Sequence, residues 1–171
     1  FERTTAGSGE VGYMTPGGGS AVLPQNDGVF DSVPTLTAVS AVCRIFAGER
    51  KSNDSLRKGM RHLDAELPSW APRKTNFYYW YYGTYAMYHA EGKKWDRWNQ
   101  AMKDALLPNQ RKGACEDGSW DPVGEWCRGG GRVYATAINV LTLEIYYRYK
   151  RANHAAVPPT PRAVKKRPRR G

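Results

Sequence analysis

The fold is decided by an aromatic stretch in the middle of the chain, Phe77-Tyr78-Tyr79-Trp80-Tyr81-Tyr82-Gly83-Thr84-Tyr85-Ala86-Met87-Tyr88. Aromatic residues at such density are also common in β-strands. The length of the stretch and the stop signal at Gly92 nevertheless predict a helix over residues 76–91. Gly83 stands among large side chains, so we expect this helix to approach its neighbours closely.

Four more helices are predicted around this one. Pro34 opens an apolar run that ends before Gly48, which is ordinary helix punctuation. The other three have apolar positions at helical spacing, over residues 54–66, 94–107 and 132–150. Two stretches rich in Gly, Ser, Asp and Pro are predicted to be loops, residues 1–33 and 109–131.

The helices are of two kinds that alternate along the chain. The first, third and fifth are apolar or aromatic on most sides, so we expect them to be buried on most sides. The second and fourth are amphipathic, with one face in water. This alternation recurs about every 40–50 residues, a period typical of helical-repeat proteins. The sequence therefore predicts an all-α fold of tandem helix pairs, with a Gly-rich N-terminal segment at 1–33, repeats at 34–150 and a tail at 151–171.

The positive charge of the chain is concentrated in that tail. The 171 residues carry a formal net charge of +10, and the last ten positions hold six basic residues and no acidic one. We expect the Pro- and Arg-rich tail to be disordered. It would bind nucleic acid or an anionic surface by charge alone, or it is only a solvated terminus. The six residues are Arg162, Lys165, Lys166, Arg167, Arg169 and Arg170.

The second loop carries a motif that resembles a known repeat. Gln110 followed by Gly118-Ser119-Trp120 is similar to the Gln-to-Gly-x-Trp element of the QW repeat in squalene–hopene and oxidosqualene cyclases. Residues 130–137 and 141–144 resemble the inner helix that follows such a repeat. The likeness covers residues 34–150. It implies an α/α toroid, in which outer helices surround an inner ring, and five helices would form a partial ring. By the same likeness Gln110, Gly118 and Trp120 are structural.

The chain departs from the terpene cyclase and protein prenyltransferase superfamily in the residues that carry its chemistry. It has no Asp-x-Asp-Asp motif, with which the cyclases protonate substrate. The prenyltransferases hold a zinc ion with Asp, Cys and His, and no histidine here stands near a cysteine in a familiar pattern. We therefore expect no bound metal and no cofactor.

Three carboxylates are nevertheless candidates for catalysis. Asp117 and Asp121 flank Trp120, where they would lie at a cavity mouth and serve acid–base chemistry or hold a cation. The interpretation that we favour is an Asp-Gly turn and an Asp-Pro turn. Glu144 is the third candidate, for an enzyme fragment whose principal acid lies elsewhere.

An aromatic pocket is the candidate for ligand binding. Its side chains would stabilise a carbocation through cation–π contacts. They are equally suited to filling the core between helices, which we favour because aromatic residues usually supply packing area. The candidates are Tyr78, Tyr79, Trp80, Tyr82, Tyr85 and Tyr134.

The three cysteines give weaker signals. Cys43 lies in an apolar helical run and is predicted to be buried. Cys115 and Cys127 share the second loop, where they form a disulfide or stay as free thiols. Two cysteines alone do not fill the four positions of a zinc site.

The function predicted from these residues is a non-catalytic binding or scaffold module, part of a larger protein or assembly. The alternatives are a cyclase-like or prenyltransferase-like enzyme fragment that acts on an isoprenoid, and a basic-tailed adaptor for nucleic acid. We expect a protein partner or self-association, with an isoprenoid or other apolar ligand as the alternative occupant. No transmembrane segment is expected, because no apolar run approaches the roughly 18–20 residues of a membrane span. The compartment is not fixed by the sequence.

Overall fold

The computed structural model describes residues 1–18, 21–22, 30–31, 34–72, 74–124 and 126–155. The six basic tail residues lie outside this part of the chain. Within it, the predicted all-α fold is confirmed. The five α-helices of the described residues are α1 (Thr35–Phe46), α2 (Asp54–Ala65), α3 (Phe77–Ala90), α4 (Gly92–Leu106) and α5 (Cys127–Ala155). Before them, β1 (Ala21–Val22) and β2 (Phe30–Asp31) pair antiparallel, Ala21 opposite Asp31.

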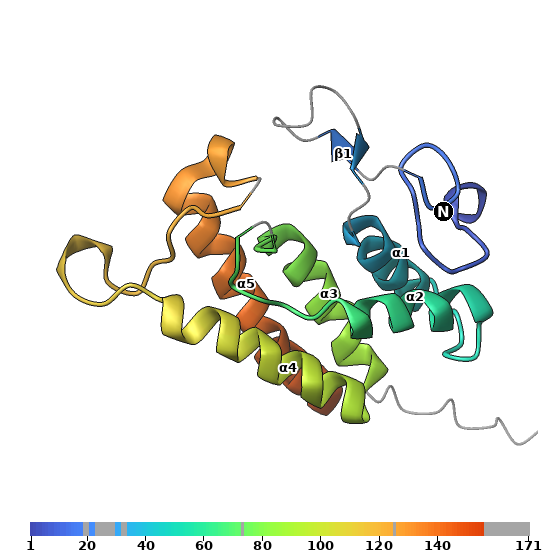
Figure 1. Ribbon diagram of the computed structural model, residues 1–171. Helices are drawn as coiled ribbons and strands as arrows, with labels where there is room; N and C mark the ends of the chain where they lie inside the picture. The colour runs from blue at the N-terminus through green and yellow to red at the C-terminus, as the bar shows by residue number, and fades with distance from the viewer. Residues whose placement is uncertain (19–20, 23–29, 32–33, 73, 125, 156–171) are drawn as a thin grey trace, which may run out of the picture.

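The helices form two layers (Figure 1). α3 lies between α1 and α5 and contacts both, and we call these three the inner layer. α2 packs on α1, and α4 packs on α3, so each outer helix covers the inner helix that precedes it. The arrangement is a repeat-like succession of inner and outer helices, which is the order that the alternating sequence pattern predicts.

The helix ends show why the predicted bounds are nearly right. The Asn53 side chain accepts a hydrogen bond from the Leu56 N–H at 3.0 Å, and Asn76 accepts one from the Tyr79 N–H at 2.9 Å. Both are N-caps, which satisfy donors that the first turn leaves free. The sequence predicts that Gly92 ends α3, but Gly92 is instead the first residue of α4. The chain reverses at Glu91 and Gly92, with φ of 62° and 60°, so the two helices are joined with almost no loop.

α5 is longer than predicted at both ends. It begins at Cys127, is broken at Gly131 (φ 57°, ψ −151°), and continues to Ala155. Three consecutive glycines favour a loop in isolation. Here the Cys127 N–H donates to the Gly124 carbonyl at 3.2 Å, which closes the turn that leads into α5. The helix therefore extends five residues beyond the predicted end at residue 150.

The core lies between the two layers and is rich in tryptophan. Trp80 and Trp98 are fully buried, and the Trp98 indole N–H donates to the Thr84 hydroxyl at 2.9 Å. A Cβ atom at Gly83 would lie 2.4 Å from the Trp98 ring. The close helix approach predicted at Gly83 is thus confirmed, because only a residue without a side chain fits there.

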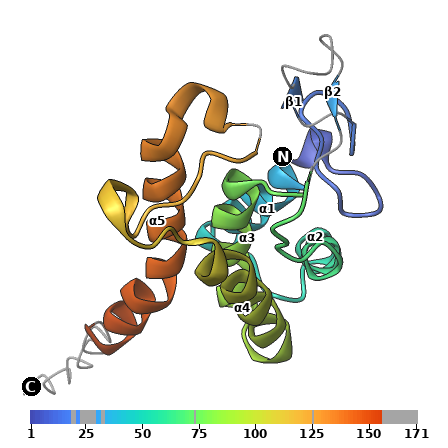
Figure 2. The same cartoon turned by 60° about the vertical axis from the view of Figure 1, so that its left-hand side comes forward.

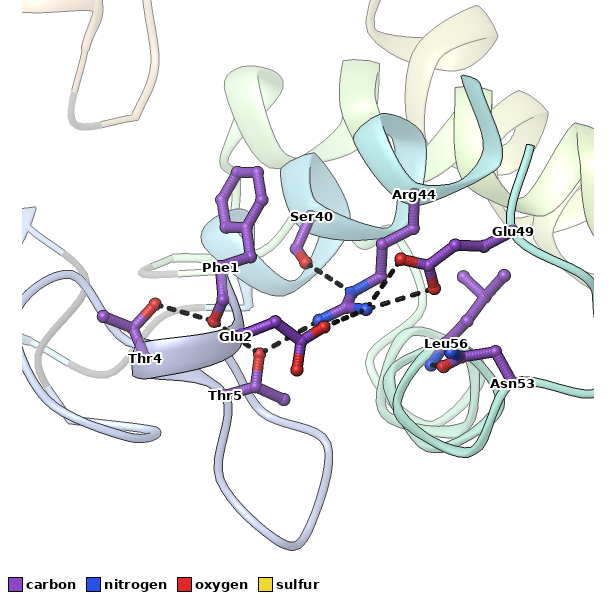
Figure 3. Close-up of polar contacts among 9 residues, drawn as sticks. All are labelled: Phe1, Glu2, Thr4, Thr5, Ser40, Arg44, Glu49, Asn53 and Leu56. Carbon is purple, nitrogen blue, oxygen red and sulfur yellow. Dashed lines mark hydrogen bonds and ion pairs between the residues drawn. The ribbon is translucent and has the colours of Figure 1, made fainter. Parts of the chain in front are cut away.

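The first residues of the chain have a defined path against α1 and α2. The Val11 side chain is buried, and its N–H donates to the Thr37 hydroxyl at 3.0 Å. Arg44 of α1 is 5% exposed and is paired with Glu2 at 2.8 Å and with Glu49 at 2.9 Å (Figure 3). The guanidinium also donates to the Ser40 hydroxyl at 3.3 Å. This loop segment therefore covers one edge of the inner layer.

α1 and α3 are buried along most of their surface, as predicted, whereas α5 is not, and α1 is exposed at its end. Cys43 is exposed, so the prediction of a buried Cys43 is wrong, and Phe46 is 60% exposed. On α5 Val133 is 81% exposed. The physical reason is that the outer helices cover only one side of the inner layer, which leaves apolar surface on the other side.

Candidate functional site

The QW-like loop ties α4 to α5. Gln110 and Trp120 form an antiparallel bridge, and the Gln110 amide donates to the Gly118 carbonyl at 2.8 Å. Trp120 is 1% exposed, and its indole N–H donates to the Leu106 carbonyl at 2.8 Å. That carbonyl is one of the acceptors that the last turn of α4 leaves without a helical partner. The three residues thus have the geometry of a structural anchor.

A similar bridge, with a similar hydrogen bond to a threonine, occurs in the N-terminal segment. Thr5 and Val11 form an antiparallel bridge, like Gln110 and Trp120. The Val11 N–H donates to the hydroxyl of Thr37 on α1, and the Trp120 N–H donates to that of Thr136 on α5 at 3.3 Å. Each loop is therefore hydrogen-bonded to the inner helix that follows it in the sequence. Sequence reasoning missed both threonines, because a lone Thr on an inner helix gives no signal without the loop that it holds.

Four charged side chains surround the bridge at Trp120. Arg111 binds Asp121 at 2.5 Å, and Arg132 binds Asp121 at 2.8 Å and Glu116 at 3.2 Å. The hydrogen bond from Arg111, followed by that from Arg132, lowers the pKa of Asp121 below its usual value. Asp121 is therefore ionised at neutral pH and is unsuited to donate a proton.

The other two candidate acids are also engaged, and they lie apart. The Asp117 carboxylate accepts a hydrogen bond from the Gly113 N–H at 2.9 Å, which closes a turn. Glu144 forms an ion pair with Arg148 at 2.8 Å on the exposed side of α5. It lies twelve residues beyond Arg132, about 18 Å along a helix. The structure does not bring the three carboxylates together.

A continuous run of aromatic rings lies along one side of α3, with Tyr81, Tyr82 and Tyr85 partly buried and Tyr78 exposed. The ring centroids of Tyr78 and Tyr82 are 5.0 Å apart, those of Tyr82 and Tyr81 5.1 Å, and those of Tyr81 and Tyr85 5.3 Å. The surface continues to α1 through Phe46, 6.1 Å from Tyr85, and to Trp126, 6.2 Å from Tyr78. We call these six residues the aromatic face: Phe46, Tyr78, Tyr81, Tyr82, Tyr85 and Trp126.

The aromatic face is uncharged at neutral pH. A hydrogen bond to Tyr78 and burial raise the pKa of Tyr82 to about 12. Burial, together with Tyr85, raises the pKa of Tyr81. Since tyrosine ordinarily titrates near pH 10, these raised pKa values keep the Tyr81 and Tyr82 hydroxyls neutral at pH 7. The face therefore offers ring surface and neutral hydroxyl groups to whatever covers it.

The predicted aromatic set is split by the structure. Tyr78, Tyr82 and Tyr85 lie in the aromatic face, but Tyr79 and Trp80 point the other way, into the core. The Tyr79 hydroxyl donates to the Glu66 carbonyl at 2.7 Å, and its ring lies 5.6 Å from that of Trp98. A continuous run of aromatic residues cannot all face one side of a helix, because neighbouring positions differ by about 100°.

Tyr134 and three residues missed from the sequence complete this region. Burial, together with the nearby Cys127 and Tyr78 side chains, raises the pKa of Tyr134 to about 12. Tyr81 belongs to the quoted stretch and could have been found from its spacing to Tyr78 and Tyr85. Phe46 and Trp126 come from other segments, and only the folded chain places them beside α3.

The cysteines form no disulfide. Cys115 is an exposed thiol, and Cys127 is a buried one that donates to the Val123 carbonyl at 3.1 Å. Of the two alternatives left open by the sequence, free thiols are the one observed. Burial raises the pKa of Cys127 to about 11, so it is an unreactive packing residue.

Two cavities of useful size lie away from the aromatic face. One, of about 330 Å³, has an apolar floor that includes Leu56 and Met60 and charged groups such as Lys51 and Glu91 at its rim. The other, of about 410 Å³, lies between α4 and α5 and includes Trp95, Met102 and Leu143. The six aromatic-face residues line neither of these two cavities.

The described residues contain no group of three or more His, Cys, Asp or Glu side chains that could hold a metal ion. None of the helices described is both long enough and apolar enough to cross a membrane. Comparison with protein-family models, with curated proteins and with solved structures finds no match to this chain. The likeness to the cyclase repeats therefore rests on the residues of the QW-like loop and the helix that follows it.

Proposed function

We propose that this chain is a non-catalytic protein-binding module built from toroid-type helix pairs, and that the aromatic face is its binding surface. The observation that carries this proposal is the continuous aromatic surface on the side of the inner layer that no outer helix covers. Surface aromatic residues in such a cluster are costly to leave in water, and tyrosine and tryptophan are enriched at the centres of protein interfaces.

The exposure of Phe46, Tyr78 and Trp126 favours a protein over a small molecule as the partner. Small ligands are usually held in concave sites that bury most of their surface, and the cavities of this size lie elsewhere in the structure. The charge of the aromatic face also indicates which kind of segment the partner would present. Its side chains are neutral, and Glu144 and Arg148 nearby on α5 compensate each other. The expected partner therefore presents an uncharged segment rich in aliphatic and aromatic side chains.

The positions of the candidate acids support the non-catalytic part of this proposal. Asp121 is held ionised between two arginines, Asp117 closes a turn, and Glu144 is paired on another face. Incubation of the protein with squalene and with farnesyl and geranylgeranyl diphosphates should give no product above a blank. Turnover that is lost in Asp121→Asn or Glu144→Gln would instead establish the isoprenoid enzyme.

The binding proposal is tested with a displayed library of random peptides, selected on the immobilised protein. Enriched peptides should be apolar and aromatic, and their affinity should fall at least tenfold for Tyr82→Glu, because the variant buries a charge at the centre of the face. Tyr82→Ala keeps the face uncharged and should weaken binding less. Tyr13→Glu is the matched control, since Tyr13 is an exposed tyrosine of the N-terminal segment.

Circular dichroism checks that each variant folds. The proposal is overturned if selection enriches no peptides, or if the enriched peptides bind Tyr82→Glu as tightly as the original protein. Loss of binding in Tyr13→Glu but not in Tyr82→Glu would move the binding surface to the N-terminal segment.

A further inference from the structure

The cavity of about 330 Å³ lies where two inner and two outer helices meet. Ile45 comes from the last turn of α1, Leu56 and Met60 from α2, Ala90 from the end of α3, and Lys94 from the first turn of α4. Pockets for small molecules start at about 300 Å³, so the space is large enough to hold one. We call it the four-helix cavity.

The floor of the four-helix cavity is apolar. Leu56 and Met60 belong to the buried core, at 4% and 7% exposure. Burial, and then the nearby Lys51, lowers the pKa of His89, so the imidazole in the cavity wall is uncharged at neutral pH. A floor of this kind favours a hydrocarbon chain, because each methylene group that it covers leaves water.

The rim of the cavity is charged, and one cation there has no counter-ion. Three pairs account for the other rim charges: Lys51 with Glu91, Glu49 with Arg44, and Arg57 with Asp54. Lys94 is half-buried, and no carboxylate of the described residues pairs with it. α4 also begins at this rim without a side-chain cap, and the positive end of its macrodipole adds to the charge of Lys94.

We infer that the four-helix cavity binds an amphiphile with a single negative charge, an apolar chain that ends in a carboxylate, as in a medium-chain fatty acid. The chain lies over Leu56 and Met60, and the carboxylate binds the Lys94 ammonium. A half-buried ammonium makes a stronger charge-assisted hydrogen bond than an exposed one. One negative charge fits better than two, because Glu49 and Glu91 on the same rim repel a second.

Calorimetric titration of the full chain with octanoate tests the site. We expect saturable binding of one molecule per chain, with a dissociation constant of about 0.1–1 mM. Butanoate should bind at least about tenfold more weakly, because it has four fewer methylene groups to bury. Octyltrimethylammonium, which has the same chain and the opposite charge, should not bind, because its head group meets Lys94.

Two variants separate the head group from the chain. Lys94→Ala should weaken octanoate binding about threefold to tenfold and leave the affinity for uncharged octanol unchanged. Ala90→Leu puts a larger side chain into the cavity and should weaken the binding of both ligands. Circular dichroism checks that each variant folds.

Lys103→Ala is the matched control. Lys103 is an exposed lysine of the same helix, but it lines the cavity between α4 and α5. Figures 1 and 2 both place α5 on the far side of α3 from α1, whereas α1 contributes to the four-helix cavity. Lys103→Ala should therefore leave the octanoate affinity unchanged.

The inference is overturned if octanoate shows no saturable binding, if Lys94→Ala binds it as tightly as the original protein, or if octyltrimethylammonium binds equally well. Loss of octanoate binding in Lys103→Ala alone would move the ligand to the cavity beside α5, and loss in Tyr82→Glu alone would move it to the aromatic face. The peptide selection at the aromatic face is independent of these outcomes, because none of the six aromatic-face residues lines the four-helix cavity.

Discussion

Replacing Gly83 by alanine tests how closely α3 and α4 pack. The added Cβ would lie 2.4 Å and 2.5 Å from two ring carbons of Trp98, so the indole must withdraw by about 1 Å to reach ordinary contact. Trp98 is fully buried and donates to the Thr84 hydroxyl at 2.9 Å, so this movement disturbs both its packing and its hydrogen bond.

The magnitude follows from opposing effects. Alanine gains about 1 kcal/mol in helix propensity, overpacking costs about 1–3 kcal/mol, and the weakened hydrogen bond costs about 1 kcal/mol more. The net loss in the free energy of unfolding should be about 1–3 kcal/mol, which lowers Tm by about 3–10 °C in a chain of this size.

A second helical glycine is the matched control. At Gly59 of α2 the added Cβ would meet its nearest neighbour, a Thr37 methyl group, at 3.4 Å, which is ordinary contact. Gly59→Ala should therefore be neutral or stabilise by up to about 1 kcal/mol. Urea denaturation followed by circular dichroism and tryptophan fluorescence measures both variants. The packing argument would be refuted by a Gly83→Ala protein as stable as the original, or by equal losses in the two variants.

Three further outcomes are expected. Asp121→Asn should lower the denaturation midpoint at pH 7, because it removes a carboxylate that two arginines stabilise in the folded protein. The folded-state pKa of Asp121 is lowered, so its contribution to stability is present above about pH 4 and is lost as the pH falls through the folded-state pKa. The midpoints of the two proteins should therefore converge in acid. Dithionitrobenzoate should react quickly with two thiols, Cys43 and Cys115, and with Cys127 only after unfolding; a single fast thiol would contradict the exposed positions. If the tail binds duplex DNA, the logarithm of the association constant should fall against the logarithm of the salt concentration with a slope no steeper than about −5. Deletion of residues 158–171 should abolish this binding. Binding that survives the deletion would exclude the tail as its source.

The sequence alone predicted each of the five α-helices of the described residues, because caps and apolar spacing are local properties, but not the three short 3-10 helices. Helix bounds were wrong where distant residues decided them. The extra turn of α5 before Gly131 depends on the segment that precedes it, and the junction at Glu91 and Gly92 depends on how α4 folds back against α3.

The candidate site was predicted less well than the fold. Periodicity would have assigned Tyr78, Tyr82 and Tyr85 to one side of a helix and Tyr79 to another. It could not show which side the outer helices cover, since that depends on Trp98 and Gly83 meeting across the core. Phe46 and Trp126 join the aromatic face only because α1 and the start of α5 flank α3.

The amino-acid sequence by itself thus determined an all-α protein of alternating helices, because helix propensity, capping and apolar spacing act over a few residues. Tertiary structure alone decided which aromatic residues stay exposed, that Asp121 lies between Arg111 and Arg132, and that the N-terminal segment packs against α1. These features depend on contacts between residues far apart in the chain, and burial and charge pairing are properties of those contacts.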